Sequence, residues 1–147
     1  MKVRLTLTAI IGCFLFSVPA EAGPYTDKMA VCLVDNTTKA EQYTLIRWTV
    51  WSYGHHPKVA DLVELDQSRE EKTQRDMANL FSTLMTERCA SETREAFRQE
   101  GQSAIEGAFN VLGQVAAREL ISAPAVNKSM TKFEKYLDEK KLKEVFN

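Results

Sequence analysis

The two histidines of the chain, His55 and His56, are its most obvious groups for metal binding or proton transfer, and they are adjacent in the segment 54–57. Neighbouring residues do not face one site on a helix, so a metal ion would need a further ligand from elsewhere. The nearest downstream carboxylates are Asp61, Glu64 and Asp66. A solvated loop with a pH-sensitive charge fits the same residues better. We therefore predict no metal and no cofactor, and keep His55 and His56 as weak metal candidates.

Motifs that reveal catalysis in a single sequence are missing from this chain. It contains no G-x-S-x-G, no H-E-x-x-H and no phosphate-binding glycine loop. Acidic pairs such as Glu70–Glu71 belong to charged helical faces, where solvation explains them. The sequence therefore favours a protein that is not an enzyme. An enzyme whose acid and base come from distant helices stays an alternative, because such a pair leaves no local signature.

The first 22 residues have the layout of a secretory signal peptide. Lys2 and Arg4 precede an apolar run over residues 5–18, and small residues lead up to Ala22. We predict cleavage after Ala22, a periplasmic or secreted protein, and a single domain over residues 23–147. The run is shorter than the roughly 20 residues that cross a bilayer as a helix. We therefore expect no permanent membrane anchor.

Processing as a lipoprotein is an alternative, because Ile10-Ile11-Gly12-Cys13 resembles a lipobox, in which the cysteine is acylated. This processing would leave only residues 5–9 as the apolar segment before the box, and it would expose the apolar residues 14–16 after it. Ordinary cleavage uses the whole apolar run and is the preferred expectation.

Removal of the leader leaves two cysteines, Cys32 and Cys89. An even pair in an exported chain indicates a disulfide rather than free thiols or metal ligands. The bond closes a loop of about 58 residues, for which the chain-entropy relation gives roughly 4 kcal/mol of stabilisation.

The rest of the chain has the pattern of a helical protein. Downstream of residue 22 it holds only five glycines and three prolines, too few turn signals for a sandwich of short strands. We predict an all-α, single-domain bundle of about five to six helices with one disulfide. The expected helices cover residues 25–34, 38–54, 68–89, 91–100 and 103–120, and a last one begins near Ala125.

Three capping boxes mark expected helix starts, at Thr38–Glu41, Ser68–Glu71 and Ser103–Glu106. The apolar stripe over 103–120 is the most regular, and small residues within it allow another helix to approach closely, so we expect this helix to be central. The tail over 138–147 is rich in Lys and Glu and is expected to fray. Four further apolar residues are expected to face the core: Phe97, Met130, Phe133 and Leu137.

The segment 38–54 is unusual because its apolar side chains cover most of the helix circumference, and it contains both tryptophans. A helix that is apolar all round is either surrounded by neighbours or presents part of itself to a partner. The first interpretation makes it a core helix, and the second makes it a binding surface. If the helix is buried, Arg47 needs an acidic partner. The candidate partner-binding residues are Tyr43, Arg47, Trp48, Trp51 and Tyr53.

The charge balance excludes one class of partner. The 147 residues contain 19 Lys and Arg against 20 Asp and Glu, a net charge of −1. Neither sign is in excess, so the chain has no electrostatic footprint for nucleic acid. We expect the partner to be another protein or a second copy of this chain in a homodimer.

Several segments of the chain resemble those of a group of small exported proteins of Gram-negative bacteria. They are residues 25–34, Leu45-Ile46-Arg47-Trp48, His56-Pro57 and Glu87-Arg88-Cys89. The resemblance spans most of the mature chain and implies a periplasmic helical architecture, without a known activity. In size, compartment and helix content, though not in motifs, the chain is also similar to helical immunity proteins that block cell-wall amidase toxins. That similarity implies an alternative role as an inhibitor of a cell-envelope enzyme.

Overall fold

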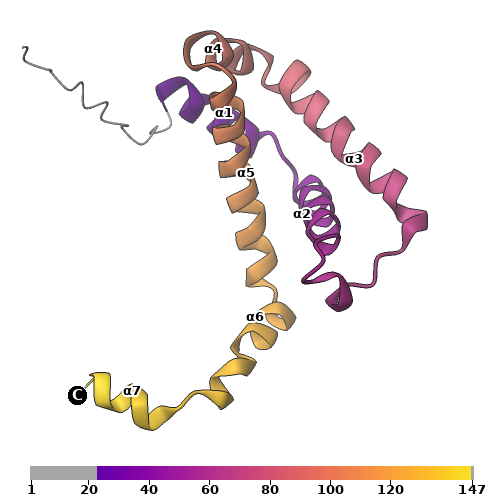
Figure 1. Cartoon of the computed structure of the whole chain (residues 1–147). Coiled ribbons are helices and arrows are strands. Elements are labelled where there is room, and N and C mark those ends of the chain that lie inside the picture. Colours follow the sequence, from indigo (N-terminus) through magenta and orange to yellow (C-terminus); the bar gives the residue numbers. More distant parts are fainter. Residues whose placement is uncertain (1–22, 147) are drawn as a thin grey trace, which may run out of the picture.

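The computed structural model describes residues 23–146, most of which are helical, with no strand among them (Figure 1). The predicted signal peptide, residues 1–22, lies outside the described residues. The all-α, single-domain fold class is confirmed. The α-helices are α1 (Pro24–Asp35), α2 (Lys39–Gly54), α3 (Glu70–Thr83), α4 (Ala90–Glu100), α5 (Gln102–Ser122), α6 (Pro124–Met130) and α7 (Glu139–Phe146). The shorter turns are η1 (Ala60–Leu62), η2 (Gln67–Arg69), η3 (Leu84–Arg88) and η4 (Thr131–Tyr136).

Helix α5 is the centre of the bundle, as its sequence predicts. It contacts α1, α2, α4 and α6. Its buried positions recur every four residues, at Ala104, Ala108, Leu112 and Ala116. Between them, a Cβ atom at Gly107 would lie 3.0 Å from Cγ2 of Thr26 in α1. The small side chains of α5 therefore allow the close approach of α1.

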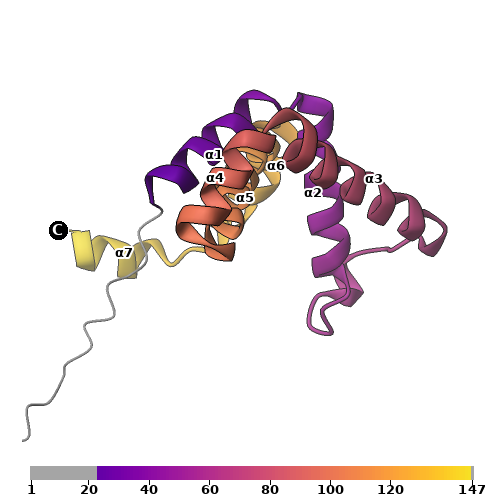
Figure 2. The same cartoon turned by 90° about the horizontal axis from the view of Figure 1, so that it is seen from above.

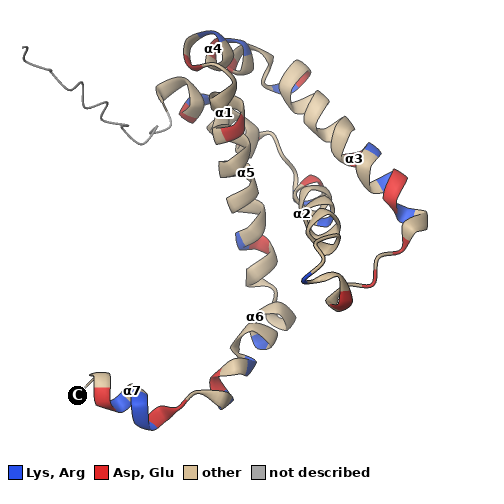
Figure 3. Cartoon of the chain, in the orientation of Figure 1, with Lys and Arg blue, Asp and Glu red and all other residues tan. Residues whose placement is uncertain are grey.

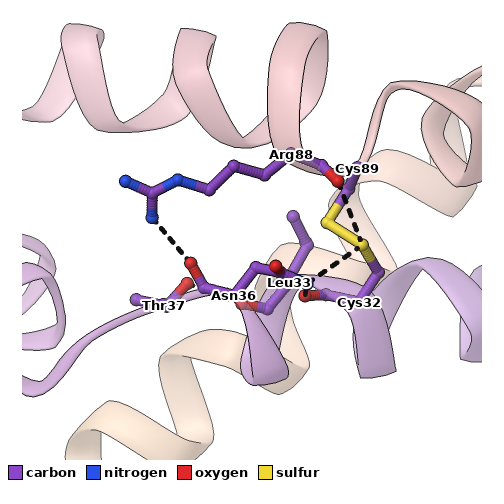
Figure 4. The surroundings of a disulfide bond; sticks show 6 residues. All are labelled: Cys32, Leu33, Asn36, Thr37, Arg88 and Cys89. Carbon is purple, nitrogen blue, oxygen red and sulfur yellow. Dashed lines mark hydrogen bonds between the residues drawn. A yellow bond between two sulfur atoms is a disulfide. The ribbon is translucent and has the colours of Figure 1, made fainter.

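The predicted disulfide is confirmed: Cys32 in α1 is bonded to Cys89, with their Cα atoms 5.9 Å apart (Figure 4). The sequence predicted a regular helix up to Cys89, but the last turn, η3, is a π-helix in which the Cys89 amide donates to the carbonyl oxygen of Leu84 (2.9 Å). Residues five apart on a regular α-helix point about 140° apart. The wider π-turn brings both Leu84 and Cys89 inward, and both are fully buried.

Helices α2 and α3 form a second pair beside α1, α4 and α5 (Figure 2). The segment between them, residues 55–69, contains the short turns η1 and η2. Helix α2 packs against both α3 and α5, and α3 runs on the far side of α2 from α5 (Figures 1 and 2). Helices α3 and α5 therefore lie on either side of α2, and long side chains such as Phe81 and Phe109 bridge between them.

One of the three predicted capping boxes forms. The Thr38 amide donates to Oε2 of Glu41 (2.9 Å), and the Glu41 amide donates to the Thr38 hydroxyl (3.3 Å). The prediction of a capping box at Ser68 is wrong. The amide and the hydroxyl of Ser68 both donate to the nearer carboxylate of Asp66, and α3 begins two residues later. The box at Ser103 is also wrong, because α5 begins one residue earlier and the hydroxyl donates to a carbonyl of the preceding helix (3.1 Å).

The prediction that Phe97, Met130, Phe133 and Leu137 face the core is wrong, since their exposed fractions are 58%, 54%, 60% and 45%. In α4 the buried position is Ala96, and Phe97 is turned away from it. The chain after Pro124 continues beyond the end of α5 and away from α1, α2, α3 and α4 (Figure 1), so none of those helices packs over these side chains. The residues of α7 are all exposed, and fraying of this tail stays a prediction.

Candidate functional site

A groove of about 610 Å³ lies between α2, α3 and α5. Its lining has no Lys, Arg, Asp or Glu, and aromatic or long apolar side chains form most of its wall. We call it the α2–α3–α5 groove. Its largest lining residues are Leu45, Trp48, Gln74, Met77, Phe81 and Phe109.

Contacts between helices hold the walls of the groove in place. The indole Nε1 of Trp48 donates to Oε1 of Gln74 (3.0 Å), which joins α2 to α3. The rings of Phe81 and Phe109 stack with their centroids 4.5 Å apart, which joins α3 to α5. A Cβ atom at Gly113 would meet nothing within 4 Å, so this part of the lining is open. The groove is therefore preformed, as ligand sites commonly are.

The five candidate partner-binding residues of α2 do not share one site. Only Trp48 lines the groove. Trp51 is 8% exposed, and its indole N–H is buried without a hydrogen-bond acceptor. Tyr43 and Tyr53 are 46% and 71% exposed, and Arg47 is also exposed. Trp51 therefore belongs to the interior and Trp48 to a concave surface, and partner binding by this segment stays a prediction.

The sequence missed the residues that complete the groove with Trp48. Met77, Phe81 and Phe109 fall in the expected helices 68–89 and 103–120, and none of them was among the candidate binding residues. The structure leaves Phe81 39% exposed, because its ring stacks on Phe109 of α5 and also lines the groove. One feature of the sequence could have indicated a groove here. The apolar side chains of α2 cover most of its circumference, which is more apolar area than one neighbouring helix can cover.

A smaller cavity of about 270 Å³ lies on another side of α2. Arg47, Trp51, Glu64, Asp66 and Arg69 are among its lining residues. Hydrogen bonds from Ser68 lower the pKa of Asp66, and Arg69 pairs with the same carboxylate (2.9 Å). A carboxylate held ionised in this way is a poor general acid. A catalytic pocket would be expected to combine carboxylates with a histidine, and neither His55 nor His56 lines this cavity.

The structure places His55 and His56 on the surface with local partners. Nδ1 of His55 lies 2.9 Å from the carbonyl oxygen of Trp51, and Nδ1 of His56 accepts from the amide of Lys58 (3.2 Å). Asp61 and Glu64 are exposed. Among residues 23–146, no group of three or more His, Cys, Asp or Glu side chains is placed to hold a metal ion.

A bidentate ion pair joins the disulfide region to α2. Arg88 donates to both carboxylate oxygens of Glu41 (2.8 and 3.0 Å) and to the carbonyl oxygen of Asn36 (2.6 Å; Figure 4). The hydrogen bond from Arg88 is the main cause that lowers the pKa of Glu41 to about 2. The contact therefore positions the start of α2, and with it Trp48.

Substitution Glu41→Gln is expected to lower stability at pH 7, with a loss that disappears in acid. The pKa of Glu41 is about 2 in the fold, against 4.5 as its ordinary value, so its stabilising contribution is complete above about pH 4.5 and is lost as the pH falls towards 2. Urea unfolding of both proteins between pH 2.5 and 7 measures the difference. Glu71→Gln, whose partner Arg75 is an exposed neighbour on the same helix, is the control. A difference that does not change with pH would contradict the assignment.

The described residues thus define an all-α domain with one disulfide and a large apolar groove. No helix within residues 23–146 has the length and hydropathy of a membrane-spanning segment. Comparison of the chain with known protein families, with curated proteins and with solved structures gives no match.

Proposed function

We propose that this is an exported, non-enzymatic protein that binds another protein in the α2–α3–α5 groove. The groove itself carries the proposal, because its open, uncharged lining offers several aromatic side chains. Buried aromatic anchors dominate the energetics of protein interfaces. Export is supported by the signal-peptide layout and by the resemblance to exported Gram-negative proteins. The Cys32–Cys89 disulfide is typical of an oxidising compartment such as the periplasm.

The shape and chemistry of the groove favour a helical partner segment. Its walls are helix side chains, and the described chain has no strand whose edge could pair with an extended peptide. An amphipathic helix places apolar residues at i, i+3, i+4 and i+7, and such a row fits a trough between helices. Figure 3 shows that charged residues gather on α4, on the first turns of α3 and on α7, while most of α5 is uncharged. The contacting face of the partner should therefore be apolar and neutral.

A photo-crosslinking amino acid at position 81 is expected to capture the partner in cells that export the protein. The matched control is the same amino acid at position 97, because Phe97 is also an exposed phenylalanine on a helix but does not line the groove. Crosslinking should occur from position 81 and not from position 97. Once the partner is identified, Phe81→Glu should weaken binding by roughly tenfold or more, as expected for an anchor residue.

The captured product also separates the alternatives. A cell-envelope enzyme would support the inhibitor role, and a second copy of the chain would assign the groove to a homodimer. Equal crosslinking from positions 81 and 97, or Phe81→Glu binding as tightly as the unaltered protein, would contradict a role for the groove.

A further inference from the structure

The first turn of α1 is capped by a residue from the far end of α4. Oε1 of Glu100 accepts from the amide of Tyr25 (3.0 Å), and Oε2 accepts from the amide and the hydroxyl of Thr26 (2.9 and 2.6 Å). The residue at the N-cap, Gly23, has no side chain with which to cap the helix. The hydrogen bond from the Thr26 hydroxyl is the main cause that lowers the pKa of Glu100. Glu100 therefore presents an ionised carboxylate to the start of α1, where the helix dipole favours negative charge.

Gly23 leaves the space that this carboxylate occupies. A Cβ atom at Gly23 would lie 2.1 Å from Oε1 and 2.4 Å from Cδ of Glu100. The φ angle of Gly23 is −75°, which any residue adopts, so the close approach of Glu100 and not the backbone conformation calls for glycine here. The nitrogen of Gly23 is two bonds from that Cβ position, which places it within about 5 Å of Oε1.

Gly23 is also the residue that follows the predicted cleavage site. Hydrolysis of the bond between Ala22 and Gly23 by an envelope protease adds the oxygen of a water molecule to the carbonyl carbon of Ala22. The nitrogen of Gly23 leaves as an amine, which takes up a proton near neutral pH. In the precursor this nitrogen is an uncharged amide, and in the product it is an ammonium group beside the carboxylate of Glu100.

We propose that Glu100 is the docking site for the new amino terminus, so that removal of the leader creates an ion pair that the precursor lacks. This inference rests on the export proposed above. The pair is needed because an unpartnered ammonium group at a helix N-terminus opposes the helix dipole. Glu100 offsets that repulsion and keeps the three hydrogen bonds that hold α1 to α4.

The test compares two forms of the chain that begins at Gly23, one with a free amine and one acetylated, each with Glu100 or Glu100→Gln. The acetyl group restores the amide of the precursor without its leader. With Glu100, the free amine should melt about 2–4 °C higher than the acetylated form. With Glu100→Gln the difference should vanish or reverse, because the ammonium group then opposes the helix dipole alone. An equal difference in both backgrounds, or none with Glu100, would overturn the pairing.

A second measurement needs no substitution at Glu100. The amine at Gly23 should react with an acylating reagent at neutral pH roughly threefold to tenfold more slowly in the folded protein than in urea, because the pair holds it protonated. A chain with Gly-Ser-Gly-Ser placed before Gly23 is the matched control, since its amine lies away from Glu100. Slow reaction of Gly23 alone supports the pair, and equal rates for the two chains would overturn it.

The mass of the exported protein tests the underlying export separately. A chain that begins at Gly23 supports both proposals. A chain that begins at the initiator methionine, or at a diacylated Cys13, would overturn the processing, and the ion pair would then not form in cells whatever the melting experiment shows.

Discussion

Replacing Cys32 or Cys89 with alanine is expected to lower the free energy of unfolding by about 4 kcal/mol, within the roughly 2–5 kcal/mol typical of a native disulfide. The bond closes a loop of 57 positions and joins α1 to the end of η3. Without the disulfide the unfolded chain gains conformational entropy. The α1 contacts with α4 and α5 must then hold α1 in place unaided. Urea unfolding of each single variant, and of the double variant, measures the loss.

The three cysteine variants should lose similar amounts, because each removes the same bond. Cys89 is fully buried and Cys32 only partly so, and a small extra loss is therefore expected where the Cys89 sulfur is removed. A reducing agent should lower the stability of the unaltered protein and leave the double variant unchanged. Clearly unequal losses for Cys32→Ala and Cys89→Ala would argue against the bond as the common cause. A free energy of unfolding that does not change when reductant is added would also argue against the bond.

Substitution Leu112→Ala is expected to destabilise the protein by about 2–5 kcal/mol. Leu112 is fully buried on α5, in the one helix that contacts α1, α2, α4 and α6. Removing its branched side chain deletes apolar contacts and leaves a cavity that the flanking alanines of α5 are too small to fill. Thermal and urea unfolding followed by circular dichroism measure the change.

Leu62→Ala is the matched control, since the same side-chain atoms are removed at a position that is 77% exposed. We expect its effect to stay within about 0.5 kcal/mol. A loss at Leu112 no larger than at Leu62 would contradict the central role of α5 in the core.

Two parts of the fold could be predicted from sequence because they follow from local chemistry. The apolar period over 103–120 predicted the central helix, and the structure buries Ala104, Ala108, Leu112 and Ala116 along it. The pairing of Cys32 with Cys89 followed from an even cysteine count after the predicted leader.

Other predictions failed where periodicity identifies an apolar face but not the neighbour that covers it. Phe97 and Phe133 have helical spacing like that of core residues, yet no helix lies over either of them. The π-turn at η3 breaks the regular period, and no local rule applied to the sequence signalled it. Ser68 has the residues of a capping box, but Asp66 competes for the same donors at shorter range.

The sequence predicted only part of the groove. The aromatic density of 38–54 marked α2 as a candidate surface, but it did not distinguish Trp48 from Trp51. That distinction depends on where α3 and α5 lie, because Gln74 binds the Trp48 indole from α3 and the Phe81–Phe109 stack joins α3 to α5. Side chains in both neighbouring helices therefore decide which tryptophan lines the groove.

The amino-acid sequence by itself determined the helical class, the central helix and the cysteine pair. Backbone propensity and apolar period depend on a few neighbouring positions, and residue counts depend on composition alone. Only the tertiary structure decided which apolar faces stay open and which distant side chain caps α1. Glu100 lies 74 positions from Thr26, and their contact exists only after α1 and α4 have packed together. Such contacts depend on the relative placement of whole helices, which no local pattern of residues specifies.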